Sequence, residues 1–153
     1  CSKHGDTMSG TQRHQIPNGV QFITASANHR YDGISSYLFA IFGGGLKDGR
    51  PSLPTSGPDT TIGNDCWIRT DATLLSGTNL GNGVIVGAGA VVSGSIPDYA
   101  IVVSNPARVV KMRFDQAEIT ILKAIAWWDC SVTAILKLEA EISGADFDAL
   151  QAV

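Results

Sequence analysis

Residues 62–92 decide the fold, and they read IGNDCWIRTDATLLSGTNLGNGVIVGAGAVV. A helix would need apolar residues spaced three and four apart, and each of its many glycines would cost about 1 kcal/mol. An extended strand would need strict alternation, which the glycines interrupt. A period of six instead predicts short strands joined by turns, each repeat turning one aliphatic side chain inward. The positions that carry this period are Ile62, Ile68, Leu74, Leu80, Val86 and Val92.

The period weakens on the N-terminal side of this tract. Residues 16–21, followed by Phe22, fit one repeat, whereas residues 1–15 do not. Between the two repeat regions lies an excursion over about 30–59, with three consecutive glycines and three prolines. A loop of this length inside a compact domain is usually functional or disordered. We therefore expect one β-helix domain over 1–114, irregular over 1–15, with a helical extension of the same domain over 115–153.

The sequence pattern changes after Pro106. Asp115 is a plausible N-cap for a helix with apolar residues at helical spacing. A second helix is predicted from Ser131 to about Ile142, with Leu136 and Leu138 near its apolar side. We expect the helices to cover the open end of the β-helix, because stacked coils must be capped.

Composition narrows the class of protein. The 153 residues are enough for one domain, and only 16% of them are charged. So few charges predict that much of the surface packs against something, and oligomerisation would do that. The net charge of −3 excludes the broad basic surface that nucleic-acid binding needs. No run is apolar enough to span a bilayer.

The cysteines and the N-terminal residues bear on the cellular compartment. The first fifteen residues are polar and show no secretory signal. Cys1, Cys66 and Cys130 are odd in number and far apart, which favours reduced thiols over a disulfide framework. These observations predict a cytoplasmic protein.

Four motifs together resemble one protein family. They are NHRYDG at 28–33, IGNDCWI at 62–68, NPA at 105–107 with RFD at 113–115, and WW at 127–128. In order and spacing this set resembles the hexapeptide-repeat xenobiotic acetyltransferases, the group of type B chloramphenicol and streptogramin A (Vat) acetyltransferases. The resemblance implies a mainly β fold, a left-handed parallel β-helix in which three repeats make one triangular coil. It also implies a homotrimer that binds acetyl-CoA between adjacent subunits and needs no metal.

The resemblance also implies roles for individual residues. His29 would be the general base that removes the proton of an acceptor hydroxyl, and imidazole titrates near neutral pH. Residues of the excursion would contact the acceptor, and the candidates are Tyr31, Tyr37, Phe39 and Leu53. The expected cofactor-binding residues are Trp67, Pro97, Ser104, Asn105, Pro106, Ala107, Arg108, Lys111 and Arg113. From the residues alone, Trp67 also fits a packed corner aromatic, and the cations also fit a solvated basic face.

Several positions depart from the family pattern. Arg69 and Val103 stand where the family usually has glycine, and only 27 residues precede the NHRYDG motif. The main hypothesis is acetyl-CoA-dependent O-acetylation of a small molecule, such as an antibiotic or another xenobiotic. One alternative is a catalytically silent hexapeptide module that has lost part of its acceptor site. Another is a zinc lyase, which needs three histidine ligands, but the chain has only His4, His14 and His29.

Overall fold

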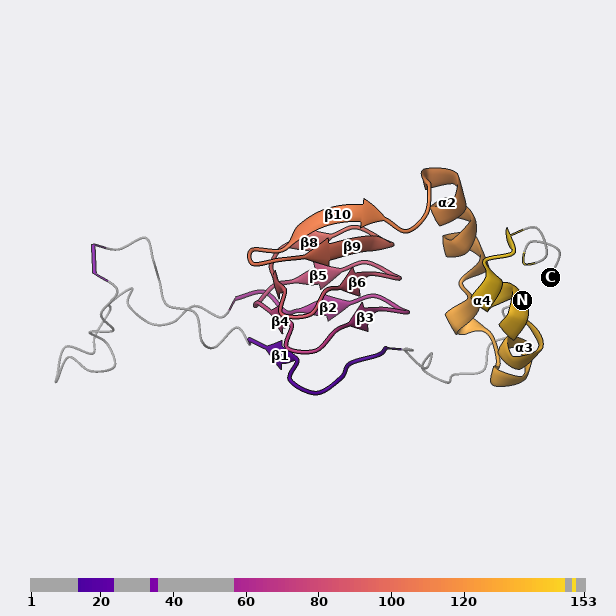
Figure 1. Ribbon diagram of the computed structural model, residues 1–153, viewed down its shortest axis with the longest axis horizontal. Coiled ribbons are helices and arrows are strands. Elements are labelled where there is room, and N and C mark those ends of the chain that lie inside the picture. Colours follow the sequence, from indigo (N-terminus) through magenta and orange to yellow (C-terminus); the bar gives the residue numbers. More distant parts are fainter. Residues whose placement is uncertain (1–13, 24–33, 36–56, 148–149, 151–153) are drawn as a thin grey trace.

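Three short sheets, parallel except for one antiparallel pair, wrap around one core in a computed structural model, which describes residues 14–23, 34–35, 57–147 and 150 (Figure 1). Each coil gives one short strand to each sheet. Equivalent residues of successive coils are 18 apart, as Asn64 and Asn82 are, but only 16 apart at the last coil, as Asn79 and Ser95 are. Sheet A contains β3, β6, β9 and β10, sheet B contains β1, β4 and β7, and sheet C contains β2, β5 and β8. The strands are β1 (Gln21–Phe22), β2 (Thr61–Ile62), β3 (Trp67–Ile68), β4 (Thr73–Leu74), β5 (Asn79–Leu80), β6 (Ile85–Val86), β7 (Val91–Val92), β8 (Ser95–Ile96), β9 (Ala100–Val103) and β10 (Arg108–Met112).

The six-residue period is confirmed in the core. Five of its six aliphatic positions, from Ile68 to Val92, are at most 1% exposed, and Ile62 packs against them from the end of the stack. Each such side chain stabilises the fold by about 1.5–3 kcal/mol through burial. A second buried stripe lies two residues before the first and holds small side chains at the coil corners. Its members are Cys66, Ala72, Thr78, Val84 and Ala90.

The coil corners require left-handed backbone. Asp65 and Gly83, one coil apart, have φ of 55° and 65°. Aspartate tolerates this conformation better than most residues, and glycine adopts it freely. At Gly83 the space is also restricted, because an added Cβ would overlap the ring of Tyr99. Small residues in the repeat therefore serve both the turn geometry and the close approach of neighbouring coils.

The helices follow the last strand. Asp115 caps α2 (Gln116–Ile125) through a capping box with Glu118, which confirms the predicted N-cap. After the short η2 (Trp127–Asp129), Ser131 caps α3 (Val132–Lys137), and α4 (Glu139–Gly144) follows. The expected single second helix is thus two helices, interrupted at Leu138, where ψ is 14°. No glycine or proline marks this break in the sequence.

Two expectations about the helices are wrong. Leu136 does not lie on an apolar side, because it is 66% exposed. The helices also lie beside the stack of coils and do not cover its end, whereas β10 runs antiparallel along β9 at the top of the stack (Figure 1). They are held laterally, since Lys123 of α2 forms an ion pair with Asp98 at a coil corner, 2.5 Å apart.

The expectation that the cysteines are reduced is confirmed for one described cysteine and wrong for the other. Cys66 is a free, buried cysteine, and burial raises the pKa of its thiol to about 11. Cys130 is disulfide-bonded, which contradicts the expectation of reduced thiols.

Candidate functional site

The outer surface of sheet A gathers side chains from four successive strands. Trp67 pairs with Ile85, Ile85 with Ile101, and Ile101 with Lys111. Their chain neighbours Ile68, Val86 and Val102 are fully buried, so strand alternation turns this first column outward. A second column follows two residues along each of the parallel strands. We call the two columns the sheet A face, and its residues are Trp67, Ile85, Ile101 and Lys111 with Arg69, Gly87, Val103 and Arg108.

The chemistry of this face differs from that of sheet C. The outward residues of sheet C are Thr61, Asn79 and Ser95, which are polar and exposed. The sheet A face instead has an apolar strip that includes Trp67, which is 42% exposed. Three cations border the strip, and no carboxylate occupies either column. With coils about 4.8 Å apart, the strip from β3 to β10 spans about 14 Å. It therefore suits an extended, partly apolar ligand that carries negative charge.

The predicted cofactor-binding residues near the NPA motif lie at one end of this face. Residues 104–107 form the turn between β9 and β10, and Arg108 of β10 pairs with Val103. The turn is fixed to the next sheet, since the Val91 amide donates to the Ser104 carbonyl at 3.1 Å and the Ala107 amide donates to the Val91 carbonyl at 2.9 Å. Pro97 lies at the opposite end of β9, before Ala100.

Arg113 lies away from the other two predicted cations. Its Nη1 donates to the Gly83 carbonyl at 2.7 Å and lies 3.8 Å from Asp65 Oδ2. Its guanidinium carbon lies 5.7 Å from the ring centre of Tyr99 and 5.3 Å from that of Phe114. The structure thus brings Trp67, Arg108 and Lys111 to one face and places Arg113 in a packed corner.

This corner contains a polar pocket of about 330 Å³, which Asp65, Tyr99 and Arg113 line together with apolar residues of the helices. Burial raises the pKa of Asp65, and the charges of Arg113 and His14 offset this only in part. Burial also raises the pKa of Tyr99, whose hydroxyl has no hydrogen-bond partner among the described residues. Tyr99 and Arg113 both contact the ring of Phe114, which lies just before the first of the helices.

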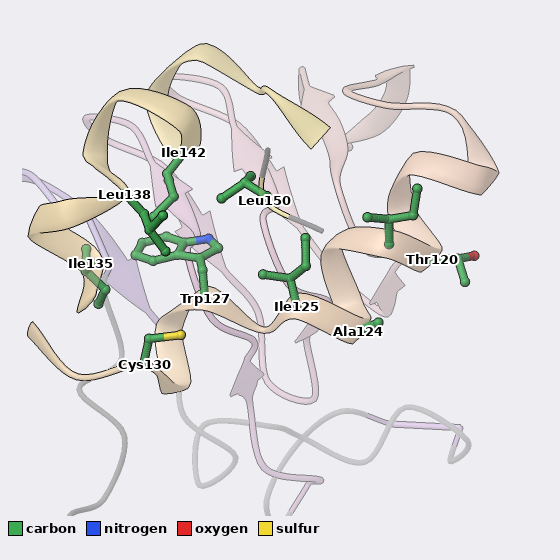
Figure 2. Close-up of a pocket in the computed structure, with 10 residues that line it drawn as sticks. Thr120, Ala124, Ile125, Trp127, Cys130, Ile135, Leu138, Ile142 and Leu150 are labelled. Carbon is green, nitrogen blue, oxygen red and sulfur yellow. The ribbon is translucent and has the colours of Figure 1, made fainter. Parts of the chain in front are cut away.

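A second pocket, of about 410 Å³, lies among the helices (Figure 2). Among the described residues, its lining holds no acid, base or cation, and Cys130 is disulfide-bonded, so these residues offer no group for acyl transfer. We therefore do not regard it as the reactive site. Its lining residues are Thr120, Ile121, Ala124, Ile125, Trp127, Cys130, Ile135, Leu138, Ile142 and Leu150.

The predicted catalytic base and the predicted acceptor contacts belong to segments that the structure does not describe. His29, Tyr31, Tyr37, Phe39 and Leu53 lie outside the described residues. Within the described ranges, no group of three His, Cys, Asp or Glu side chains is placed to hold a metal ion. None of the helices described has the length and apolar character needed to cross a bilayer.

Sequence reasoning did not identify Arg69, Ile85 and Ile101 as part of a site. The signal was available, because each residue that precedes an inward aliphatic residue must point outward. Three of these outward residues, Trp67, Ile85 and Ile101, are apolar, which is unusual for a solvated strand face. Reading the inward period alone concealed this second pattern.

Comparison with known proteins gives a consistent result. A family model described as bacterial transferase hexapeptide (six repeats) matches residues 59–94. A probable macrolide acetyltransferase of Lysinibacillus sphaericus is 41% identical over 119 residues, covering 76% of this chain and 66% of that protein. A chloramphenicol acetyltransferase of Escherichia coli is 36% identical, covering 74% of this chain and 55% of the relative.

A virginiamycin A acetyltransferase of Staphylococcus aureus is 38% identical over 139 residues, covering 89% of this chain and 63% of the relative. The chain thus spans about 55–66% of the length of these three relatives. Among solved structures, a hexapeptide-repeat acetyltransferase of Vibrio cholerae complexed with acetyl coenzyme A is 24% identical. The match has a TM-score of 0.46 and covers 63% of this chain and 44% of that one.

Proposed function

The chain belongs to the hexapeptide-repeat family and is related to antibiotic acetyltransferases, and from that premise we propose that it is an acetyl-CoA-dependent O-acetyltransferase. Its acceptor is a hydroxyl group of a small molecule of the antibiotic or xenobiotic class. The observation that carries this proposal is the sheet A face, where an apolar strip and cations lie side by side without a carboxylate. Coenzyme A has the matching character, with an extended arm and a phosphate-rich end.

Two groups of residues bind different parts of acetyl-CoA. Trp67, Ile85 and Ile101 provide the apolar surface for the arm of the coenzyme. Arg108 and Lys111, at the β10 end, bind its phosphates, for which guanidinium and ammonium groups are suited. In this proposal the protein is a homotrimer, and the apolar strip supports contact between copies, because a second copy facing the strip would enclose the donor. The proposal also places the protein in the cytoplasm, although the disulfide at Cys130 does not support that location.

His29 acts as the general base in this proposal. It accepts the proton of the acceptor hydroxyl while the oxygen attacks the carbonyl carbon of the thioester. The new C–O bond forms, the C–S bond breaks, and the thiolate of coenzyme A leaves and takes up a proton. The products are the acetyl ester and free coenzyme A.

Thiol release from acetyl-CoA, measured across a panel of hydroxylated antibiotics, tests the reaction. Calorimetric titration with coenzyme A tests the donor site on its own. We expect His29→Ala to abolish thiol release while coenzyme A still binds, and Lys111→Gln to weaken that binding. Lys137→Gln, which makes the same charge change on α3, is the control. A folded protein that does not bind coenzyme A would refute the proposal and favour a silent hexapeptide module.

A further inference from the structure

Arg69 is the one cation of the sheet A face that stacks on its tryptophan. The guanidinium carbon lies 5.3 Å from the centre of the Trp67 ring, within the range of a cation–π contact. Both side chains are exposed, and in the part of the chain that the structure describes Arg69 forms no ion pair. Its charge is therefore directed at the indole.

The position of Arg69 separates it from the phosphate-binding end proposed above. Arg69 follows β3, whereas Arg108 and Lys111 lie on β10, three strands and about 14 Å away. At physiological ionic strength charges that far apart on a surface are largely screened from each other. Arg69 must therefore act through what it touches, and among the described residues it contacts the indole of Trp67.

We propose that Arg69 is a positioning residue that holds the Trp67 indole in one orientation, so that the free part of the ring is ready to pack against the arm of the coenzyme. The inference rests on the proposed function, because it assigns Trp67 to the donor site. An exposed tryptophan would otherwise sample several rotamers and lose this freedom on binding. Stacking restricts the ring beforehand, and one coil above Arg69 stands Gly87, which adds no side chain beside it.

Calorimetry with coenzyme A and with pantetheine, which lacks the nucleotide and its phosphates, tests the inference. We expect Arg69→Gln to weaken both ligands by the same factor, about two- to fivefold. Arg69→Lys keeps a cation and should recover part of the affinity. In a Trp67→Leu background, Arg69→Gln should cause no further loss of affinity for either ligand. The unfolding midpoint of Arg69→Gln should equal that of the parent protein. Lys137→Gln is again the charge-matched control.

Three outcomes would overturn the positioning role. They are an unchanged affinity in Arg69→Gln, an equal additional loss in the Trp67→Leu background, or a loss confined to coenzyme A with pantetheine spared. The last result would mean that the guanidinium contacts a phosphate directly. A parent protein that binds neither ligand would refute the proposed function itself, so the two failures are distinguishable.

Discussion

Two glycines with nearly equal φ allow the packing of one coil corner to be measured. Gly83 and Gly89 have φ of +65° and +66°. An added Cβ at Gly89 would meet nothing within 4 Å, whereas at Gly83 it would overlap Cδ1 and Cε1 of Tyr99. Alanine at either position costs about 1–2 kcal/mol for left-handed backbone. At Gly83 the overlap with a buried ring adds about 1–3 kcal/mol.

We therefore expect Gly83→Ala to lower the free energy of unfolding more than Gly89→Ala does, by about 1–3 kcal/mol. Denaturant unfolding of the two variants and the parent gives this difference, and the shared backbone strain cancels in the comparison. Arg113 and Tyr99 both contact this corner, so Gly83→Ala should also perturb the aromatic near-ultraviolet signal. Equal losses in the two variants would refute the placement of Tyr99 against Gly83.

Three further predictions concern buried or paired groups. Tyr99→Phe should raise the free energy of unfolding by about 1 kcal/mol, because the hydroxyl lacks a partner among the described residues; a loss would show that it is hydrogen-bonded in solution. Burial alone would raise the pKa of Asp98, but hydrogen bonds from Lys123 and Asn82 hold it below its usual value. Asp98→Asn should therefore cost about 0.5–1 kcal/mol at pH 7, and in pH-dependent denaturation this difference should shrink as pH falls below about 3.9. A constant difference down to pH 2 would contradict the ion pair. Cys66 should resist iodoacetamide at pH 8 until the protein is unfolded, because its thiol pKa is about 11, and rapid labelling of the folded protein would contradict its burial.

The sequence predicts the β-helix well because one physical constraint repeats in it. Each repeat must turn one aliphatic side chain inward, and the positions from Ile68 to Val92 do so without exception. The N-cap at Asp115 was equally predictable, since a capping box is a local signature. Where a feature depends on residues within a few positions, sequence alone was sufficient.

Features that depend on distant contacts were not predictable in this way. The direction of Arg113 is set by a carbonyl 30 residues away, and its local sequence only marks it as basic. The break at Leu138 and the exposure of Leu136 likewise have no local signal, since no glycine or proline stands at the break. The helices lie beside the stack (Figure 1), where Lys123 pairs with Asp98, and no periodicity in the sequence predicts that pair.

The separation of inward from outward residues in the coils has an evolutionary consequence. Ile68, Val86 and Val102 support the stack, whereas their neighbours Trp67, Ile85 and Ile101 only face outward. Substitutions in the outward set can change what the surface recognises while the fold persists, because surface changes away from the core usually cost little stability. Arg69 also stands at an exposed, outward position of this kind. The coil thus provides a durable frame on which selectivity for new chemicals can be acquired one residue at a time.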